Sequence, residues 1–88
     1  MTTYAVSYDL IKRKDYPSLI KALQTYNYWH CLGSTWIIKS QGTAQSIYDN
    51  LKGHIDADDK LIVVKLIREA HWTQSFSADC QKWLQDNL

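Results

Sequence analysis

The fold of this chain is decided by one stretch of sequence, Tyr4-Ala5-Val6-Ser7-Tyr8-Asp9-Leu10. Large apolar side chains at positions 6, 8 and 10 alternate with small or polar ones at positions 5, 7 and 9, which is the period of two that a pleated strand requires. Asp9 stands out, because a carboxylate near the middle of a sheet is costly unless it is paired, bound or left at an open rim. The stretch therefore predicts an interior strand that carries an acid at its end.

The composition is that of a small globular chain rich in aromatic residues. Of its 88 residues 45% are hydrophobic, with 4 Trp and 6 Tyr. This length indicates a single domain over residues 1–88, with a core at 3–67 and a C-terminal extension at 68–88. A domain of this size buries only about 60–65% of its unfolded surface, so pairing with a second copy is an expected remedy. The net charge of +1 means that any nucleic-acid binding must come from a local patch.

The two cysteines, Cys31 and Cys80, lie far apart in the sequence and form no Cys-x-x-Cys pair. No disulfide framework is expected from this spacing. The sequence also contains no apolar run of the length of a signal or membrane segment. The expectation is a cytoplasmic protein with reduced thiols and no membrane partner.

Periodicity along the rest of the chain predicts the remaining elements. We expect a helix that begins near Asp15-Tyr16-Pro17-Ser18, a hairpin of strands at 28–32 and 35–39, a helix capped by Thr43, a strand at 60–67 buried on both faces, and a short terminal helix capped by Ser77. The order is typical of an α+β, ferredoxin-like βαββαβ fold, in which two helices cover one face of an antiparallel sheet. The other face is left for a partner or for the terminal segment.

Asp9 is the first candidate for chemistry, as a divalent-metal ligand or a general base at the sheet rim. One carboxylate is too few for tight Mg²⁺ binding, and a symmetric dimer could supply a second. The alternative is that Asp9 caps the loop or pairs with Lys12 or Arg13. The run Lys12-Arg13-Lys14 could contact phosphate, or it could be a solvated loop.

Other residue types give weaker signals. The aromatic residues could stack on nucleic-acid bases or pack against strands; they are Tyr26, Tyr28, Trp29 and Trp36. The histidines and cysteines match no zinc spacing. The acids at 56, 58 and 59 lack the Gly and Glu of a calcium loop and are interpreted as a turn. A third alternative, a ligand-binding regulatory module, ranks last because the sequence has no Gly-rich phosphate loop or ligand motif.

The strand ending in Tyr8-Asp9-Leu10, the amphipathic helix after it and the step Ser34-Thr35-Trp36 resemble one group of proteins. These are the small CRISPR-associated proteins of the adaptation complex, which partner the spacer integrase, and the related virulence-associated protein D ribonuclease toxins. The resemblance covers about residues 3–67. Stand-alone bacterial relatives of the SinR-like type share a tract similar to Trp29-His30-Cys31-Leu32-Gly33-Ser34-Thr35-Trp36.

This resemblance implies a homodimer directed at RNA or DNA. It implies that Asp9 of each protomer holds Mg²⁺ or Mn²⁺ for phosphodiester hydrolysis by an endonuclease, and that Tyr8 and Ser34 support the site. Lys12, Arg13 and Lys14 would then bind nucleic acid, in place of arginines that the family carries on its first helix and hairpin. The alternative is a non-catalytic dimeric scaffold that docks a larger protein partner through its open sheet face.

Overall fold

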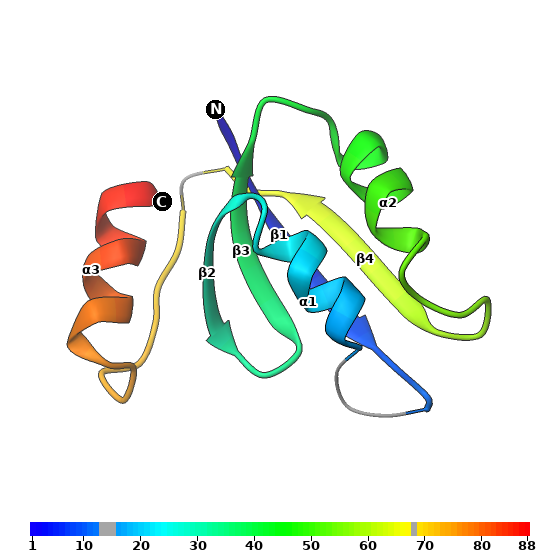
Figure 1. The fold of residues 1–88 in the computed structure, drawn as a ribbon. Helices are drawn as coiled ribbons and strands as arrows, with labels where there is room; N and C mark the ends of the chain where they lie inside the picture. The colour runs from blue at the N-terminus through cyan, green and yellow to red at the C-terminus, as the bar shows by residue number, and fades with distance from the viewer. Residues whose placement is uncertain (13–15, 68) are drawn as a thin grey trace.

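The computed structural model describes residues 1–12, 16–67 and 69–88, except for the side chain of Cys31. In chain order the elements are β1 (Thr2–Asp9), α1 (Pro17–Leu23), β2 (Asn27–Leu32), β3 (Thr35–Ser40), α2 (Ala44–Lys52), β4 (Lys60–Lys65) and α3 (Ala78–Asn87). The strands form one four-stranded antiparallel sheet in the order β2-β3-β1-β4 (Figure 1). The predicted α+β class, the antiparallel sheet and the C-terminal helix are confirmed.

β1 is a central strand because it pairs with β3 on one side and with β4 on the other. Tyr4, Val6 and Tyr8 are buried, and the residues between them are less buried. The alternation found in the sequence is therefore the alternation between the two faces of the sheet.

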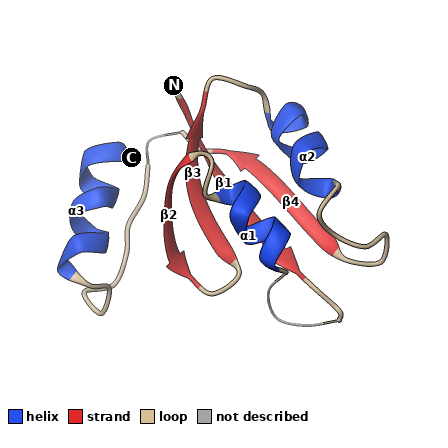
Figure 2. Ribbon diagram, in the orientation of Figure 1, coloured by secondary structure: helices blue, strands red, loops and turns tan. Residues whose placement is uncertain are grey.

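Helices α1 and α2 both cover the face that carries these buried residues (Figure 2). Each helix contributes leucine or isoleucine one turn apart to the core, at Leu19 and Leu23 from α1 and at Ile47 and Leu51 from α2. Such spacing places both side chains on one side of a helix. The core is therefore a single layer between the sheet and two helices.

All three helices begin where the sequence predicts, and two of the three expected caps are confirmed. Thr43 caps α2 in a capping box with Ser46, and the Ser77 hydroxyl accepts a hydrogen bond from the backbone N–H of Cys80 at the start of α3. At α1 the capping position is Tyr16, which makes no side-chain cap. Asp15, the expected cap, lies outside the described residues.

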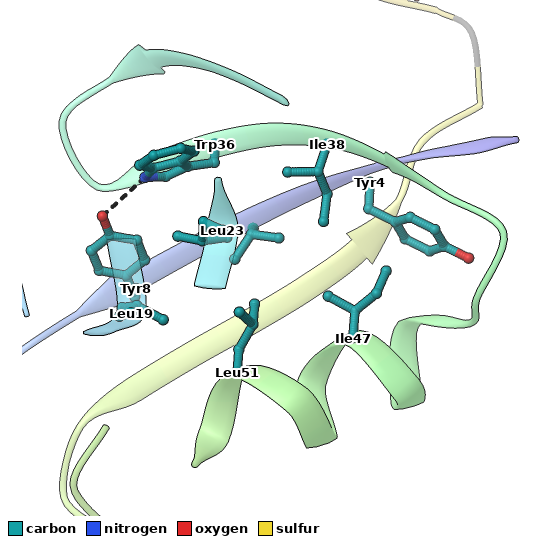
Figure 3. Close-up of a cluster of buried hydrophobic side chains, with 9 residues drawn as sticks. Tyr4, Tyr8, Leu19, Leu23, Trp36, Ile38, Ile47 and Leu51 are labelled. Carbon is teal, nitrogen blue, oxygen red and sulfur yellow. Dashed lines mark hydrogen bonds between the residues drawn. The ribbon is translucent and has the colours of Figure 1, made fainter. Parts of the chain in front are cut away.

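One buried polar pair joins the two central strands of the core. The indole Nε1 of Trp36 on β3 donates to the hydroxyl of Tyr8 on β1 at 3.0 Å (Figure 3). Trp36 is 1% exposed and Tyr8 5%, so this bond lies in an apolar environment where a lost partner is costly.

The C-terminal segment lies on the opposite face, next to β2 and β3. Trp83 of α3 stacks on Trp29 with ring centroids 6.2 Å apart. Thr3 and Lys39 donate to the backbone oxygen and side-chain oxygen of Asn87, at 3.4 and 3.3 Å. Trp29, Thr3 and Lys39 alternate with core residues in their strands, which places them on the face away from α1 and α2.

Cys80 on α3 is buried and disulfide-bonded. The expectation of reduced thiols is therefore wrong for this residue. The sequence contains only one other cysteine, Cys31, whose side chain is outside the described part of the structure.

The expectation that the last strand is buried on both faces is also wrong. β4 ends at Lys65 and forms an edge of the sheet. Leu61 and Val63 pack against the core, but Ile62 and Val64 on the other face are 57% and 44% exposed. The reason is that the C-terminal segment covers β2 and β3 and leaves this part of the sheet uncovered.

Replacing Tyr8 with Phe tests the buried pair. Tyr8→Phe leaves the Trp36 indole N–H without its acceptor, so we expect the free energy of unfolding to fall by about 1–3 kcal/mol in urea titrations. Tyr48→Phe is the matched control, since Tyr48 is exposed and its hydroxyl makes no hydrogen bond to any described residue; it should change stability by less than about 0.5 kcal/mol. Equal effects of the two variants would contradict a structural role for the pair.

Candidate functional site

Asp9 lies at the exposed end of β1, on the face away from the helices, opposite Lys60 in the register of β4. No hydrogen bond or ion pair engages its carboxylate among the residues that the structure describes. Because Asp9 lies at the exposed end of the strand, its charge remains in water and the cost of burying a carboxylate does not arise. The alternative in which Asp9 pairs with Lys12 is wrong, since Lys12 Nζ lies 2.9 Å from a carboxylate oxygen of Asp56.

The structure does not bring the Tyr8 hydroxyl, another predicted catalytic group, beside Asp9. Tyr8 points into the core from the opposite face, where its hydroxyl accepts from Trp36 (Figure 3). Ser34 lies in the turn between β2 and β3, and its backbone oxygen accepts from the Tyr8 N–H at 3.1 Å. Adjacent residues of a strand face opposite ways, so the Tyr8 hydroxyl cannot share a site with Asp9.

Only Lys12 of the predicted basic loop belongs to the described residues. Lys12 is bound to Asp56, and this hydrogen bond and charge raise the pKa of the lysine. Its ammonium is therefore shared with a carboxylate, which reduces its attraction for phosphate. Arg13 and Lys14 lie outside the described residues.

The acid with the most hydrogen bonds is Asp59, which the sequence analysis interpreted only as part of a turn. Asp59 accepts hydrogen bonds from the backbone N–H groups of Ile11 at 2.9 Å and Asp56 at 2.7 Å, and from the Tyr16 hydroxyl at 3.3 Å. Burial would raise its pKa, but these hydrogen bonds outweigh burial and lower the pKa below the ordinary value of 3.8. Asp59 thus ties the loop after β1 to the turn before β4.

The Asp59 contacts have a weak sequence signal. The spacing of Asp56 and Asp59 is that of an acid that accepts a backbone N–H three residues away in a turn. The bonds to Ile11 and Tyr16 join positions more than forty residues apart, and no local pattern could indicate them.

The described residues of one chain do not fit a divalent metal. No group of three or more His, Cys, Asp or Glu side chains comes together among them. Asp9 offers one carboxylate, and Mg²⁺ bound by so few protein ligands relies on phosphate oxygens and water for the rest. A metal site at Asp9 would therefore need a second chain or the substrate itself.

The aromatic residues considered for base stacking are engaged in packing. Trp36 stacks with His30 at 3.9 Å and lies 5.1 Å from the Tyr28 ring. Trp29 stacks on Trp83, and the Tyr26 hydroxyl accepts from the Asn50 side chain. These contacts favour the packing alternative.

A partly apolar surface remains beside Asp9. It consists of Ala5 and Ser7 on β1 and their register neighbours Val64 and Ile62 on β4, and we call it the β1–β4 strip. Ser7 is hydrogen-bonded to Thr35 at 2.9 Å, so its polar atom is partly satisfied within the sheet. An exposed apolar surface on a sheet is typical of an interaction site.

Comparison with protein-family models and with curated proteins finds no match to this chain. The family resemblance of the sequence therefore stays a prediction. None of the helices in the described part of the chain is long and apolar enough to cross a membrane.

The Asp59 hydrogen bonds predict a pH dependence of stability. A carboxyl whose pKa is lowered on folding stabilises the fold above its unfolded pKa, and this contribution is lost as the pH falls through the folded pKa. Asp59→Asn should therefore be less stable than the parent at pH 7 in urea titrations, and the difference should shrink below a pH of about 3.8.

Asp58→Asn is the matched control, because Asp58 is exposed and has no hydrogen bond or ion pair to a described residue. It should follow the parent at both pH values. A deficit of Asp59→Asn that persists unchanged at pH 3 would contradict a role of the ionised carboxylate.

Proposed function

We propose that this chain is a non-catalytic homodimeric interaction module whose β1–β4 strip packs against the strip of a second copy. The observation that carries the proposal is the exposure of Ile62 and Val64, which are 57% and 44% accessible in a domain whose core side chains are almost fully buried. Small domains have little core with which to offset chain entropy. Burial of this surface against a copy would therefore add stability where it is needed.

The surroundings of the strip favour a symmetric partner. β4 has a neighbouring strand on one side only, and an unpaired strand edge is a template for another strand. At one end of the strip, Asp9 and Lys60 are register partners on the same face of the sheet. Lys65 pairs with the buried Tyr4 and so lies on the face that the helices cover. A two-fold interface brings the same patch of both subunits together, so acids and lysines of opposite subunits can meet around an apolar centre.

We also infer that the fold is ferredoxin-like. Each of α1 and α2 connects two strands that are separated in the sheet by one other strand: β3 lies between β1 and β2, and β1 lies between β3 and β4. This double split connection is the ferredoxin-like plan that the sequence predicts. In this plan α1 and α2 cover one face of the sheet, and the β1–β4 strip proposed for dimerisation lies on the other face.

The dimer is tested by replacing the two exposed apolar residues of the strip. Ile62→Thr with Val64→Thr keeps β-branched side chains but removes apolar surface from each subunit, so we expect dimer dissociation to be favoured about 100-fold or more. Sedimentation equilibrium of the full chain measures this change. Ile11→Thr is the control, because Ile11 is also an exposed isoleucine but lies beyond the end of β1. A parent that is monomeric at high micromolar concentration would overturn the proposal.

A second candidate function is favoured by the carboxylate of Asp9, which has no hydrogen bond or ion pair to a residue that the structure describes. It is the predicted nucleic-acid-directed endonuclease, similar to the CRISPR-associated adaptation proteins, with Mg²⁺ or Mn²⁺ held between Asp9 of two copies. In support, Asp9 lies on the same face as the β1–β4 strip, so a dimer formed there would carry both acids on its surface. The metal would activate water for attack on the phosphorus, and the bond to the leaving oxygen would break.

Asp9→Asn tests this candidate. It should abolish cleavage of single-stranded RNA or DNA by the parent in Mg²⁺ or Mn²⁺, a loss of about 100-fold or more, because the amide is a poor ligand for a hard cation. Asp58→Asn should cleave at the parental rate. If Asp9→Asn cleaves as fast as the parent, or if the parent does not cleave at all, the catalytic candidate is lost and the interaction module remains.

A further inference from the structure

A cavity of about 440 Å³ lies between the sheet and the C-terminal segment. Its floor is the part of β2 and β3 that faces away from α1 and α2, and its walls come from residues 70–76 and from α3. The cavity is separate from the β1–β4 strip, because it shares no lining residue with it. Figure 1 shows the connector before α3 running beside β2.

The lining of the cavity is mainly apolar and aromatic. Ile37 forms the floor, Trp72 and Phe76 belong to the connector, and Leu84 comes from α3. Polar groups are few, with two threonine hydroxyls and the imidazole of His71, and no charged residue lines the cavity within the described part of the chain. A lining of this kind, with a few polar groups among apolar walls, is typical of sites for neutral small molecules.

The size of the cavity decides what it can hold. The cavity opens to solvent, since Leu32 in its lining is 52% exposed. Pockets that bind small molecules range from about 300 to 1,000 Å³. A cavity of about 440 Å³ therefore matches a molecule of two or three aromatic rings.

We propose that this cavity is a binding site for a neutral aromatic molecule of two or three rings, held between the sheet floor and the aromatic residues of the connector. The ligand stacks against Trp72 and Phe76, and hydrogen bonds to Thr35 or His71 orient it. Stacked aromatic contacts and burial of apolar area supply the affinity. The C-terminal segment thus forms the wall of a ligand site whose floor is the sheet.

The segment is anchored well enough to form such a site. The Trp29–Trp83 stack holds α3 against β2, and Asn87 is bonded to Thr3 and Lys39 at the end of the helix. The Cys80 side chain is buried and disulfide-bonded. These anchors fix α3, while residues 70–76 contain no helix or strand and can adjust to a ligand.

The experiment is a fluorescence titration of the full chain with N-phenylnaphthylamine, a neutral three-ring probe that brightens in apolar surroundings. We expect saturable binding of one probe per chain and, in a ¹⁵N correlation spectrum, shifts of the amides at 70–76 that exceed those at 62–64. Ile37→Trp fills the floor and should weaken binding about tenfold or more. Val64→Trp adds a similar ring on the uncovered part of the same sheet face and should leave the affinity unchanged.

Phe76→Ala is the second variant, to be used if Ile37→Trp does not fold, since Phe76 lies in the connector outside the core. It should also lower the affinity for the probe about tenfold. The proposal is overturned if binding does not saturate or if the largest amide shifts lie at 62–64. It is also overturned if Val64→Trp lowers the affinity for the probe as much as the cavity variants do. Those last two outcomes would place the probe on the β1–β4 strip.

Discussion

The alternation of side chains along β1 is the constraint on which the rest of the structure depends. Because β1 is paired on both sides, its large residues set the core face and its small residues set the opposite face. A shift of one residue would move Val6 and Tyr8 to the wrong side. The Trp36–Tyr8 hydrogen bond reinforces this register. In a shifted register the buried indole N–H would lose its acceptor, and a buried donor without a partner is costly.

Elements whose information is local were predictable from the sequence. The β1 alternation, the hairpin around Gly33 and the caps at Thr43 and Ser77 each depend on a few neighbouring residues, and the structure agrees with them. The expectation for β4 failed for a different reason. An apolar run does not indicate whether its second face is covered, and here the cover lies over β2 and β3.

The candidate site was less predictable, because its contacts join distant parts of the chain. Lys12 was assigned to phosphate or to Asp9, yet it binds Asp56 on the turn before β4. Asp59 has no motif, although it gathers more hydrogen bonds than any acid considered from the sequence. An exposed strand end was one of the positions that the sequence left open for Asp9, beside pairing and metal binding, because a bare carboxylate inside a sheet is costly.

The lysines at the two ends of β4 have a consequence for how the protein behaves when it is concentrated. Between Lys60 and Lys65 the strand is an apolar run on an open sheet edge, and an exposed apolar edge strand can pair with further chains. Flanking lysines repel one another when strands stack in register. The two lysines therefore oppose the stacking of many copies of this chain along the exposed edge of β4.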